Sequence, residues 1–204
     1  MTQEKAPLLS LEDVVFSYPD AEPALDGVSI AIHRGERIAV LGNNGAGKST
    51  FFLVCNAILR PQHGALYSDG ERIQYTKKEL TALRKKVGIV FQDADSQIIA
   101  STVESEISFG PMNLRLPREE VEQLVDEAVE QMDLEAYRLR PPQYLSGGEK
   151  KRVSIADILA MHPEIILFDE PTASLDPKNT ALLEGTLERL SAAGITLVVS
   201  THDV

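Results

Sequence analysis

Short apolar runs recur along the chain and are separated by polar stretches with helical spacing. They lie within KVGIVFQ at 86–92, EIILFDE at 164–170 and GITLVVSTH at 194–202. Runs that are nearly all apolar predict strands buried on both faces, as in a parallel sheet covered by helices. RIAVL at 37–41 has the same character, so we expect this strand also to be buried on both faces.

Two further strand signals lie near the start of the chain. LLSLEDVVFSY at 8–18 has a strand-like composition. The segment 27–42 reads as two short strands around the turn HRGE. These strands come before any predicted helix.

Helical patterns fill the intervals between the later strands. A helix over 48–59 should end before Pro61, and one over 149–161 should end before Pro163. A helix starting near Pro117 has one apolar face, formed by Val121, Leu124, Val125, Ala128 and Met132. Alternating strands and helices predict an α/β fold with a largely parallel sheet and helices on both faces. The charge-rich helical stretch from about 111 to 142 is expected to be an insertion between two strands.

Composition narrows the class of protein. A chain of 204 residues suits one domain, and a net charge of −11 disfavours direct binding to nucleic acid. The single cysteine, Cys55, lies in an apolar stretch and fits a reducing compartment. No apolar run approaches the ~18 to 20 residues of a membrane span, so a membrane role would require a partner.

GNNGAGKST at 42–50 follows the strand at 37–41 and opens the helix at 48–59. The spacing Gly42-x4-Gly47-Lys48-Ser49 matches the phosphate-binding loop, in which backbone amides and the helix N-terminus receive phosphate oxygens. Lysine at this position reaches the terminal phosphates, and the serine hydroxyl binds Mg²⁺. A glycine-rich turn without a ligand is the alternative, but the flanking strand and helix favour a site for ATP or GTP.

A pair of carboxylates follows the buried strand in EIILFDE. Asp169 at the strand end is placed to help hold the Mg²⁺ of a phosphate-loop enzyme. Glu170 comes next, and because adjacent strand residues point to opposite sides it can face an attacking water as general base. Ordinary surface charge is the alternative for such a pair.

LSGGEKKR at 145–152 lies between the phosphate loop and the two carboxylates. Its order and sequence resemble the nucleotide-binding domains of ATP-binding cassette (ABC) transporters, whose signature is LSGGQ. Gln92 resembles the glutamine of the family's Q-loop, and SLDP at 174–177 resembles its D-loop. His202 resembles the switch histidine. Tyr18 stands where the family places an aromatic residue that stacks on adenine. The resemblance implies a P-loop fold with a RecA-like core, an N-terminal antiparallel β subdomain and a helical subdomain at about 111–160, in one domain spanning 1–204.

The resemblance also implies the site. Lys48, Gln92, Glu170 and His202 would act in catalysis, and Ser49, Gln92 and Asp169 would hold Mg²⁺. ATP would contact the following residues: Tyr18, Asn43, Asn44, Gly45, Ala46, Gly47, Lys48, Ser49 and Thr50. A second ATPase subunit, identical or related, would pack head to tail, so that Ser146, Gly147, Gly148 and Glu149 of each chain meet the nucleotide of the other. Glu149 stands in place of the signature glutamine, and this replacement is common among the energy-coupling-factor ATPases that the chain resembles. Asp157 stands where many members of the wider family have arginine.

The stretch 87–116 and the sequence from the signature to SLDP look most like the energy-coupling-factor ATPases of cobalt or nickel uptake. By this resemblance, Gln92–Gln97 would line a groove for the transmembrane subunit, with Asp95, Ser96 and Gln97 as contacts. A solvated polar loop is the alternative for these three. The protein would then lie on the cytoplasmic face of the membrane, without nucleic acid as a partner.

Three alternatives remain open at this point. The cargo could be a vitamin instead of a metal ion, the protein could be a soluble ABC ATPase outside transport, or it could bind nucleotide without turnover. Family members continue well beyond the switch histidine, so we also expect this sequence to be truncated at its C-terminal end.

Overall fold

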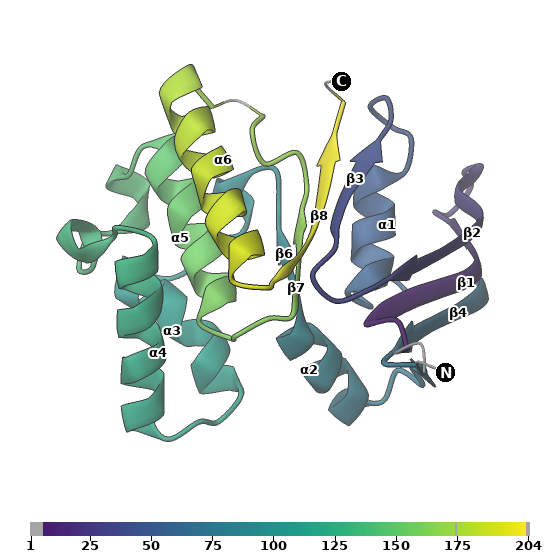
Figure 1. Cartoon of the computed structure of the whole chain (residues 1–204), viewed down its shortest axis with the longest axis horizontal. Coiled ribbons are helices and arrows are strands. Elements are labelled where there is room, and N and C mark those ends of the chain that lie inside the picture. The colour runs from purple at the N-terminus through teal and green to yellow at the C-terminus, as the bar shows by residue number, and fades with distance from the viewer. Residues whose placement is uncertain (1–5, 174, 203–204) are drawn as a thin grey trace.

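The computed structural model describes residues 6–173 and 175–202, which form two sheets and a set of flanking helices (Figure 1). The strands are β1 Leu9–Ser17, β2 Pro23–Ile32, β3 Arg37–Leu41, β4 His63–Ser68, β5 Glu71–Arg72, β6 Val87–Val90, β7 Ile165–Phe168 and β8 Thr196–Thr201. The α-helices are α1 Lys48–Cys55, α2 Lys77–Lys86, α3 Val103–Asn113, α4 Arg118–Gln131, α5 Gly147–Leu159 and α6 Pro177–Ala192. Short 3₁₀ turns lie at Ala94–Ser96, Glu135–Tyr137 and Pro142–Tyr144.

The strands divide into an antiparallel and a parallel sheet. The antiparallel sheet has the order β2-β1-β4-β5, and the parallel sheet has the order β3-β8-β7-β6. In the parallel sheet, Ile165 of β7 pairs with Val87 of β6 on one side and with Thr196 of β8 on the other. The predicted parallel sheet with helices on both faces is therefore confirmed, since α1 lies on one face and α5 and α6 lie on the other (Figure 1).

Strand β7 separates two hydrophobic cores. Ile165 and Leu167 face the core that the sheet shares with α1 and the antiparallel sheet, whereas Ile166 and Phe168 face the core that it shares with α3, α4, α5 and α6. All four side chains are fully buried. Because each buried side chain of this size contributes roughly 1.5–3 kcal/mol, this short strand anchors both layers of the molecule.

The expectation that 37–41 is buried on both faces is wrong. In the described part of the chain β3 pairs only with β8, and its residues alternate between exposed and partly buried. Ile38 and Val40 pack against the core shared with α1, but Leu41 is 56% exposed. The apolar run therefore belongs to an edge strand that has one covered face.

Helix α1 is shorter than the predicted 48–59, because it ends at Cys55. The side-chain amide of Asn56 donates to the carbonyl of Val87 at 2.6 Å, and Ala57 adopts a left-handed φ of 52°. These two features turn the chain away from the helix axis at the point where β6 begins. Cys55 is fully buried, and burial raises the pKa of its thiol.

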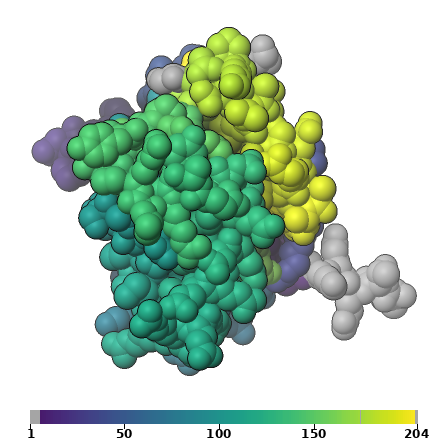
Figure 2. All heavy atoms as spheres, turned by 90° about the vertical axis from the view of Figure 1, so that its left-hand side faces the viewer, coloured from purple at the N-terminus to yellow at the C-terminus, as the bar shows by residue number. Residues whose placement is uncertain are grey.

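The helical layer begins earlier than the sequence suggested. Helix α3 starts at Val103 and contains Pro111, which we expected near the start of the helical stretch. Helix α4 begins directly after Pro117 and buries Val121, Val125 and Ala128, which confirms its apolar face. Helices α3 to α5 form one continuous face of the molecule, with α6 beside them (Figure 2). The division into a core and a helical subdomain at about 111–160 stays a prediction.

Asp157 is a partly buried carboxyl group on α5. Burial and the charge of the nearby Glu106 raise its pKa to about 7. The folded protein therefore keeps a proton on Asp157 that the unfolded chain releases near pH 4. Stability from this group is complete at low pH and is lost as the pH rises toward 7.

Asp157→Asn should accordingly stabilise the protein more at pH 8 than at pH 5, by an increment on the order of 2 kcal/mol, since the amide has no proton to lose. Urea unfolding at the two pH values measures the difference. The exposed Glu130 offers a matched control, and Glu130→Gln should shift stability little at either pH. The same gain at both pH values would contradict a raised pKa at Asp157.

Candidate nucleotide-binding site

The phosphate loop joins β3 to α1 at the carboxyl edge of the parallel sheet. Gly47 has a φ of 89°, and a Cβ there would overlap the carbonyl oxygen of Ala24, so only glycine fits. Helix α1 has no side-chain cap, a feature that it shares with α4, whereas Thr76, Thr102, Ser146 and Asp176 cap the starts of α2, α3, α5 and α6. The first amides of α1 therefore suit an anion, as the sequence predicted.

Lys48 is buried at the start of α1, and its ammonium already has oxygen partners. The Nζ donates to the carbonyl of Gly42 at 2.6 Å and to that of Asn43 at 3.2 Å. It also pairs with Glu170 Oε1 at 3.1 Å, and both side chains are almost fully buried. The cation thus lies against the phosphate loop and directly contacts the predicted general base.

The two oxygens of Glu170 face two different groups. Oε1 meets Lys48, and Oε2 lies 3.2 Å from Nδ1 of His202. Glu170 also has a φ of 43°, an unusual left-handed conformation for a residue with a side chain. Such conformations persist where the surroundings fix them, and they concentrate at functional sites.

Ser200 holds the two adjacent carboxylate residues in place. Its hydroxyl donates to Asp169 Oδ1 at 2.7 Å and accepts the backbone N–H of Glu170 at 2.9 Å. Sequence reasoning missed this residue. The available signal was a hydroxyl side chain within the buried run of β8, where a polar group requires a partner.

Tyr18 lies next to the phosphate-loop helix. Its hydroxyl is 3.3 Å from Oγ1 of Thr50, and its ring meets Phe16 edge to face at 5.1 Å between centroids. The ring is 42% exposed, so one surface remains open to solvent. The position is compatible with stacking on a base, which stays a prediction.

The carboxyl ends of the four parallel strands lie at one edge of the sheet. Most of the predicted site residues come shortly after these ends in the chain. Gly42 follows β3, Gln92 follows β6, Asp169 follows β7, and His202 follows β8. This edge is where open parallel sheets bind ligands. The structure brings Lys48, Glu170 and His202 into direct contact, whereas the side chain of Gln92 is exposed beyond β6.

Ser146 caps the helix that carries the signature segment. Its hydroxyl accepts the N–H of Glu149, and Glu149 Oε2 accepts the N–H of Ser146 at 2.6 Å. Hydrogen bonds from Tyr137 and Ser146 lower the pKa of Glu149, so this carboxylate stays charged. Gly147 faces open space, but a Cβ on Gly148 would overlap the side chain of Asn179 on α6.

The signature and the phosphate loop occupy different places in the fold. Helix α5 lies on one side of the parallel sheet and α1 lies on the other (Figure 1). Of the SLDP segment, Ser174 lies outside the described residues. Asp176 caps α6 by accepting the N–H groups of Lys178 and Asn179 at 2.9 and 3.0 Å.

The predicted groove residues have bonds within the chain. Asp95 pairs with Lys150 at 2.5 Å, Ser96 donates to the carbonyl of Asp93 at 2.7 Å, and Gln97 Oε1 accepts the N–H of Phe91 at 3.2 Å. Gln97 is thus directed back toward the end of β6. A groove for a membrane subunit stays a prediction, and the side chain of Asp95 is 68% exposed.

The donor set for Mg²⁺ fits a site completed by nucleotide oxygens. Asp169 is buried, and Ser200 donates to only one of its two carboxylate oxygens. Ser49 is exposed in the first turn of α1, next to Lys48. Within residues 6–173 and 175–202, no three His, Cys, Asp or Glu side chains cluster closely enough to hold a metal ion alone. A hydroxyl, one carboxylate and phosphate oxygens are the ligands that Mg²⁺ prefers.

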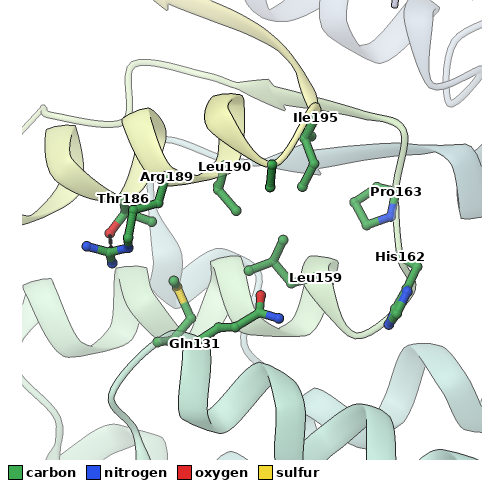
Figure 3. A pocket seen from close by; sticks show the side chains of 10 residues that line it. Gln131, Leu159, His162, Pro163, Thr186, Arg189, Leu190 and Ile195 are labelled. Atoms are coloured by element: carbon green, nitrogen blue, oxygen red, sulfur yellow. Dashed lines mark hydrogen bonds between the residues drawn. The ribbon is translucent and has the colours of Figure 1, made fainter. Parts of the chain in front are cut away.

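A pocket of 590 Å³ lies away from this site (Figure 3). Leu190 and Arg189 of α6 line one side of it, and Leu159 and Gln131 line the other. Arg189 donates to Thr186 Oγ1 at 3.1 Å at its margin. None of the residues predicted for nucleotide binding or catalysis lines this pocket.

Comparisons with known proteins identify the family. The ABC transporter family matches residues 25–173. The chain is 52% identical over 197 residues to the energy-coupling factor transporter ATP-binding protein EcfA of Methanothermobacter thermautotrophicus, covering 97% of this chain and 63% of that protein. The solved structure of cbiO1 from Clostridium perfringens, described as part of the ABC transporter complex cbiONQ, has a TM-score of 0.86 and 40% identity, covering 98% of this chain and 80% of that one. A dimeric ATP-binding cassette described with ADP and Pi after hydrolysis has a TM-score of 0.85 and 32% identity, covering 96% of this chain and 88% of that one.

The chain therefore belongs to the ABC transporter family and has the P-loop fold of an ABC ATPase, as the sequence indicated. It spans 63% of the length of its relative from M. thermautotrophicus. Among the helices of the described residues, none is both long enough and apolar enough to span a bilayer.

Ser200→Ala should destabilise the protein by about 1–3 kcal/mol, because a buried carboxylate oxygen of Asp169 loses its donor and the N–H of Glu170 loses its acceptor. Chemical denaturation measures this loss. Ser108→Ala is the matched control, since the Ser108 hydroxyl bonds only its own helix, at Ser105, and its removal should cost well under 1 kcal/mol. Equal losses in both variants would contradict the bridging role of Ser200.

Proposed function

We propose that the protein hydrolyses ATP as the nucleotide-binding subunit of an energy-coupling-factor importer. The observation that carries this proposal is the contact chain Lys48–Glu170–His202 beside an uncapped phosphate-loop helix. A module that only binds nucleotide needs the loop and the lysine. It does not need a buried carboxylate fixed between a lysine and a histidine, with its backbone N–H bonded to Ser200.

Each residue has a role in this reaction. The amides of the loop and Lys48 would receive the phosphates, and Ser49, Asp169 and Gln92 would hold Mg²⁺, which supplies charge stabilisation when bound. Glu170 would accept a proton from the attacking water, and His202 would orient that carboxylate and contact the terminal phosphate. Tyr18 would stack on the base.

The contact between Lys48 and Glu170 must change when nucleotide binds. Lys48 cannot bond to a terminal phosphate in its present position without loosening at least one of its three oxygen partners. Transfer of the ammonium to phosphate would free Oε1 of Glu170 to face water. Binding would thus prepare the base for catalysis.

A head-to-tail dimer would complete the site. The capped start of α5 presents Ser146 and Gly147 on the side of the sheet away from α1, so one chain would offer its signature to the loop of another. A related cassette is described as a dimer with ADP and Pi, which supports this arrangement. The partner would be a second copy or a related ATPase.

The cargo would be a transition-metal ion, cobalt or nickel, imported through membrane subunits at the cytoplasmic face. Support comes from the structural neighbour cbiO1, described as part of the complex cbiONQ. The name of the energy-coupling-factor relative states no cargo, and a vitamin is the alternative. A soluble ABC ATPase outside transport is less well supported.

Glu170→Gln should lower ATP turnover by about 10²-fold or more, because the amide cannot accept a proton from water. ATP affinity should be unchanged or tighter, since Lys48 loses a charged competitor for the phosphates. Phosphate release and equilibrium nucleotide binding test the two parts separately. Glu184→Gln on the exposed face of α6 is the matched control and should retain full turnover. Turnover at the wild-type rate in Glu170→Gln would exclude Glu170 as the base.

Transport can be tested with the protein and the membrane subunits that co-purify with it, reconstituted in vesicles. We expect ATP-dependent uptake of Co²⁺ or Ni²⁺ that is lost with Glu170→Gln. Uptake of a vitamin in place of either metal would establish the alternative cargo. Absence of any membrane subunit from the purified complex would favour a soluble ABC ATPase.

A further inference from the structure

Lys151 is a buried cation that holds the backbone after β6. Its side chain is 3% exposed, and its Nζ donates to the carbonyl of Phe91 at 2.8 Å and to that of Gln92 at 2.7 Å. The lysine lies on α5, one turn beyond the cap at Ser146. Two consecutive peptide groups of the Gln92 segment are therefore attached to the helix that carries the signature.

The partners of this ammonium are unusual for a buried charge. In the part of the chain that the structure describes, Lys151 forms no ion pair with a carboxylate, and Asp93 and Asp169 act on it only electrostatically. Burial lowers its pKa. Burying a cation against neutral carbonyls costs free energy that an uncharged, well-packed side chain would avoid. The position therefore favours a role beyond packing.

Two further contacts restrain the same segment, one to α5 through Lys150 and one within the segment through Gln97. Lys150 pairs with Asp95, whose side chain is 68% exposed, and Gln97 returns to accept the N–H of Phe91. On the other side, the N–H of Asp169 donates to the carbonyl of Val90 at 2.9 Å. The peptides from Val90 to Gln92 are thus held by β7 at one end and by α5 at the other.

We propose that Lys151 is a positioning residue that couples the two halves of the nucleotide site. It transmits a displacement of Gln92, which serves the chain's own nucleotide, to the start of α5, which serves the nucleotide of the partner subunit. This inference rests on the proposed head-to-tail assembly. It concerns a residue outside both the phosphate loop and the Ser146–Glu149 signature.

The chemistry of lysine suits this coupling. Hydrogen bonds from a charged donor are roughly twice as strong as neutral ones, so the attachment survives small changes in geometry. The flexible stem lets Nζ follow both carbonyls as they move, which a short neutral donor could not do. Arginine would keep the charge and the donors, but its rigid fork would fit the two carbonyls less well.

Lys151→Met keeps the apolar stem and removes the ammonium. Hydrogen exchange in the full chain should then show amides of 91–97 exchanging about 10-fold faster or more, because the segment loses its attachment to α5. ATP turnover should fall about 10-fold while the affinity for ATP changes less than about 2-fold. Because the proposed dimer has two coupled sites, we expect wild-type turnover to depend on ATP sigmoidally, and this dependence should become hyperbolic in the variant. Lys151→Arg should restore part of each property.

Lys150→Met is the matched control on the same helix. It removes a pair with an exposed carboxylate, which is weak in water, so exchange at 91–97 should rise less than about 3-fold and turnover should stay near wild type. Unchanged exchange at 91–97 in Lys151→Met, or equal loosening in both variants, would overturn the proposal. So would normal cooperativity in a folded Lys151→Met protein.

The same measurements remain informative if the wild-type protein is inactive or if Lys151→Met does not fold. If wild-type protein hydrolyses no ATP, the proposed function fails, but the exchange data still test the attachment of 91–97 to α5. If Lys151→Met does not fold, Lys151→Gln takes its place, since it also removes the charge. A folded Lys151→Gln protein with lost cooperativity and unchanged affinity would support the coupling, and one with wild-type cooperativity and exchange would contradict a need for the lysine.

Discussion

The double pairing of β7 fixes the geometry on which the site depends. β7 is bonded to β6 and to β8 along its whole length, and its four side chains anchor the cores on both faces of the sheet. As a result, the residues that follow the three strands leave the sheet at the same edge and at the same level along the strands. Asp169 can then reach Ser200, and Glu170 can reach His202.

Electrostatics at this edge places one cation against one carboxylate. Lys48 and Glu170 are both almost fully buried, so their attraction is screened little by water. Removing either partner would leave the other charge buried without its oppositely charged partner, which is costly. A polyanionic ligand that draws Lys48 toward itself supplies a replacement partner for the cation, while His202 remains beside Glu170.

The sequence predicted the fold class and the residues of the edge, but not all of their surroundings. Gly42 to Ser49 carry a local pattern that can be read directly, and Asp169 follows an apolar strand, whereas His202 was assigned only through the resemblance to the family. Ser200 and Lys151 carry no such pattern, because their partners are distant in sequence and become visible only when strands and helices are packed. The prediction that 37–41 is buried on both faces was wrong for a related reason. Apolar composition does not distinguish a central strand from an edge strand whose second face is open. Helix α1 ended early because Asn56 bonds to β6, a contact that helical spacing cannot indicate.

The contact between Gly148 and Asn179 limits how the helical layer can move. There is no room for even a methyl group between the start of α5 and α6, so the two helices cannot come closer at that point. Any motion of the signature segment relative to α6 is therefore restricted to sliding along it or separating from it. Because α6 is followed in the chain by β8, and β8 by His202, the contact between Gly148 and Asn179 joins the signature segment to the element that precedes the strand of the histidine.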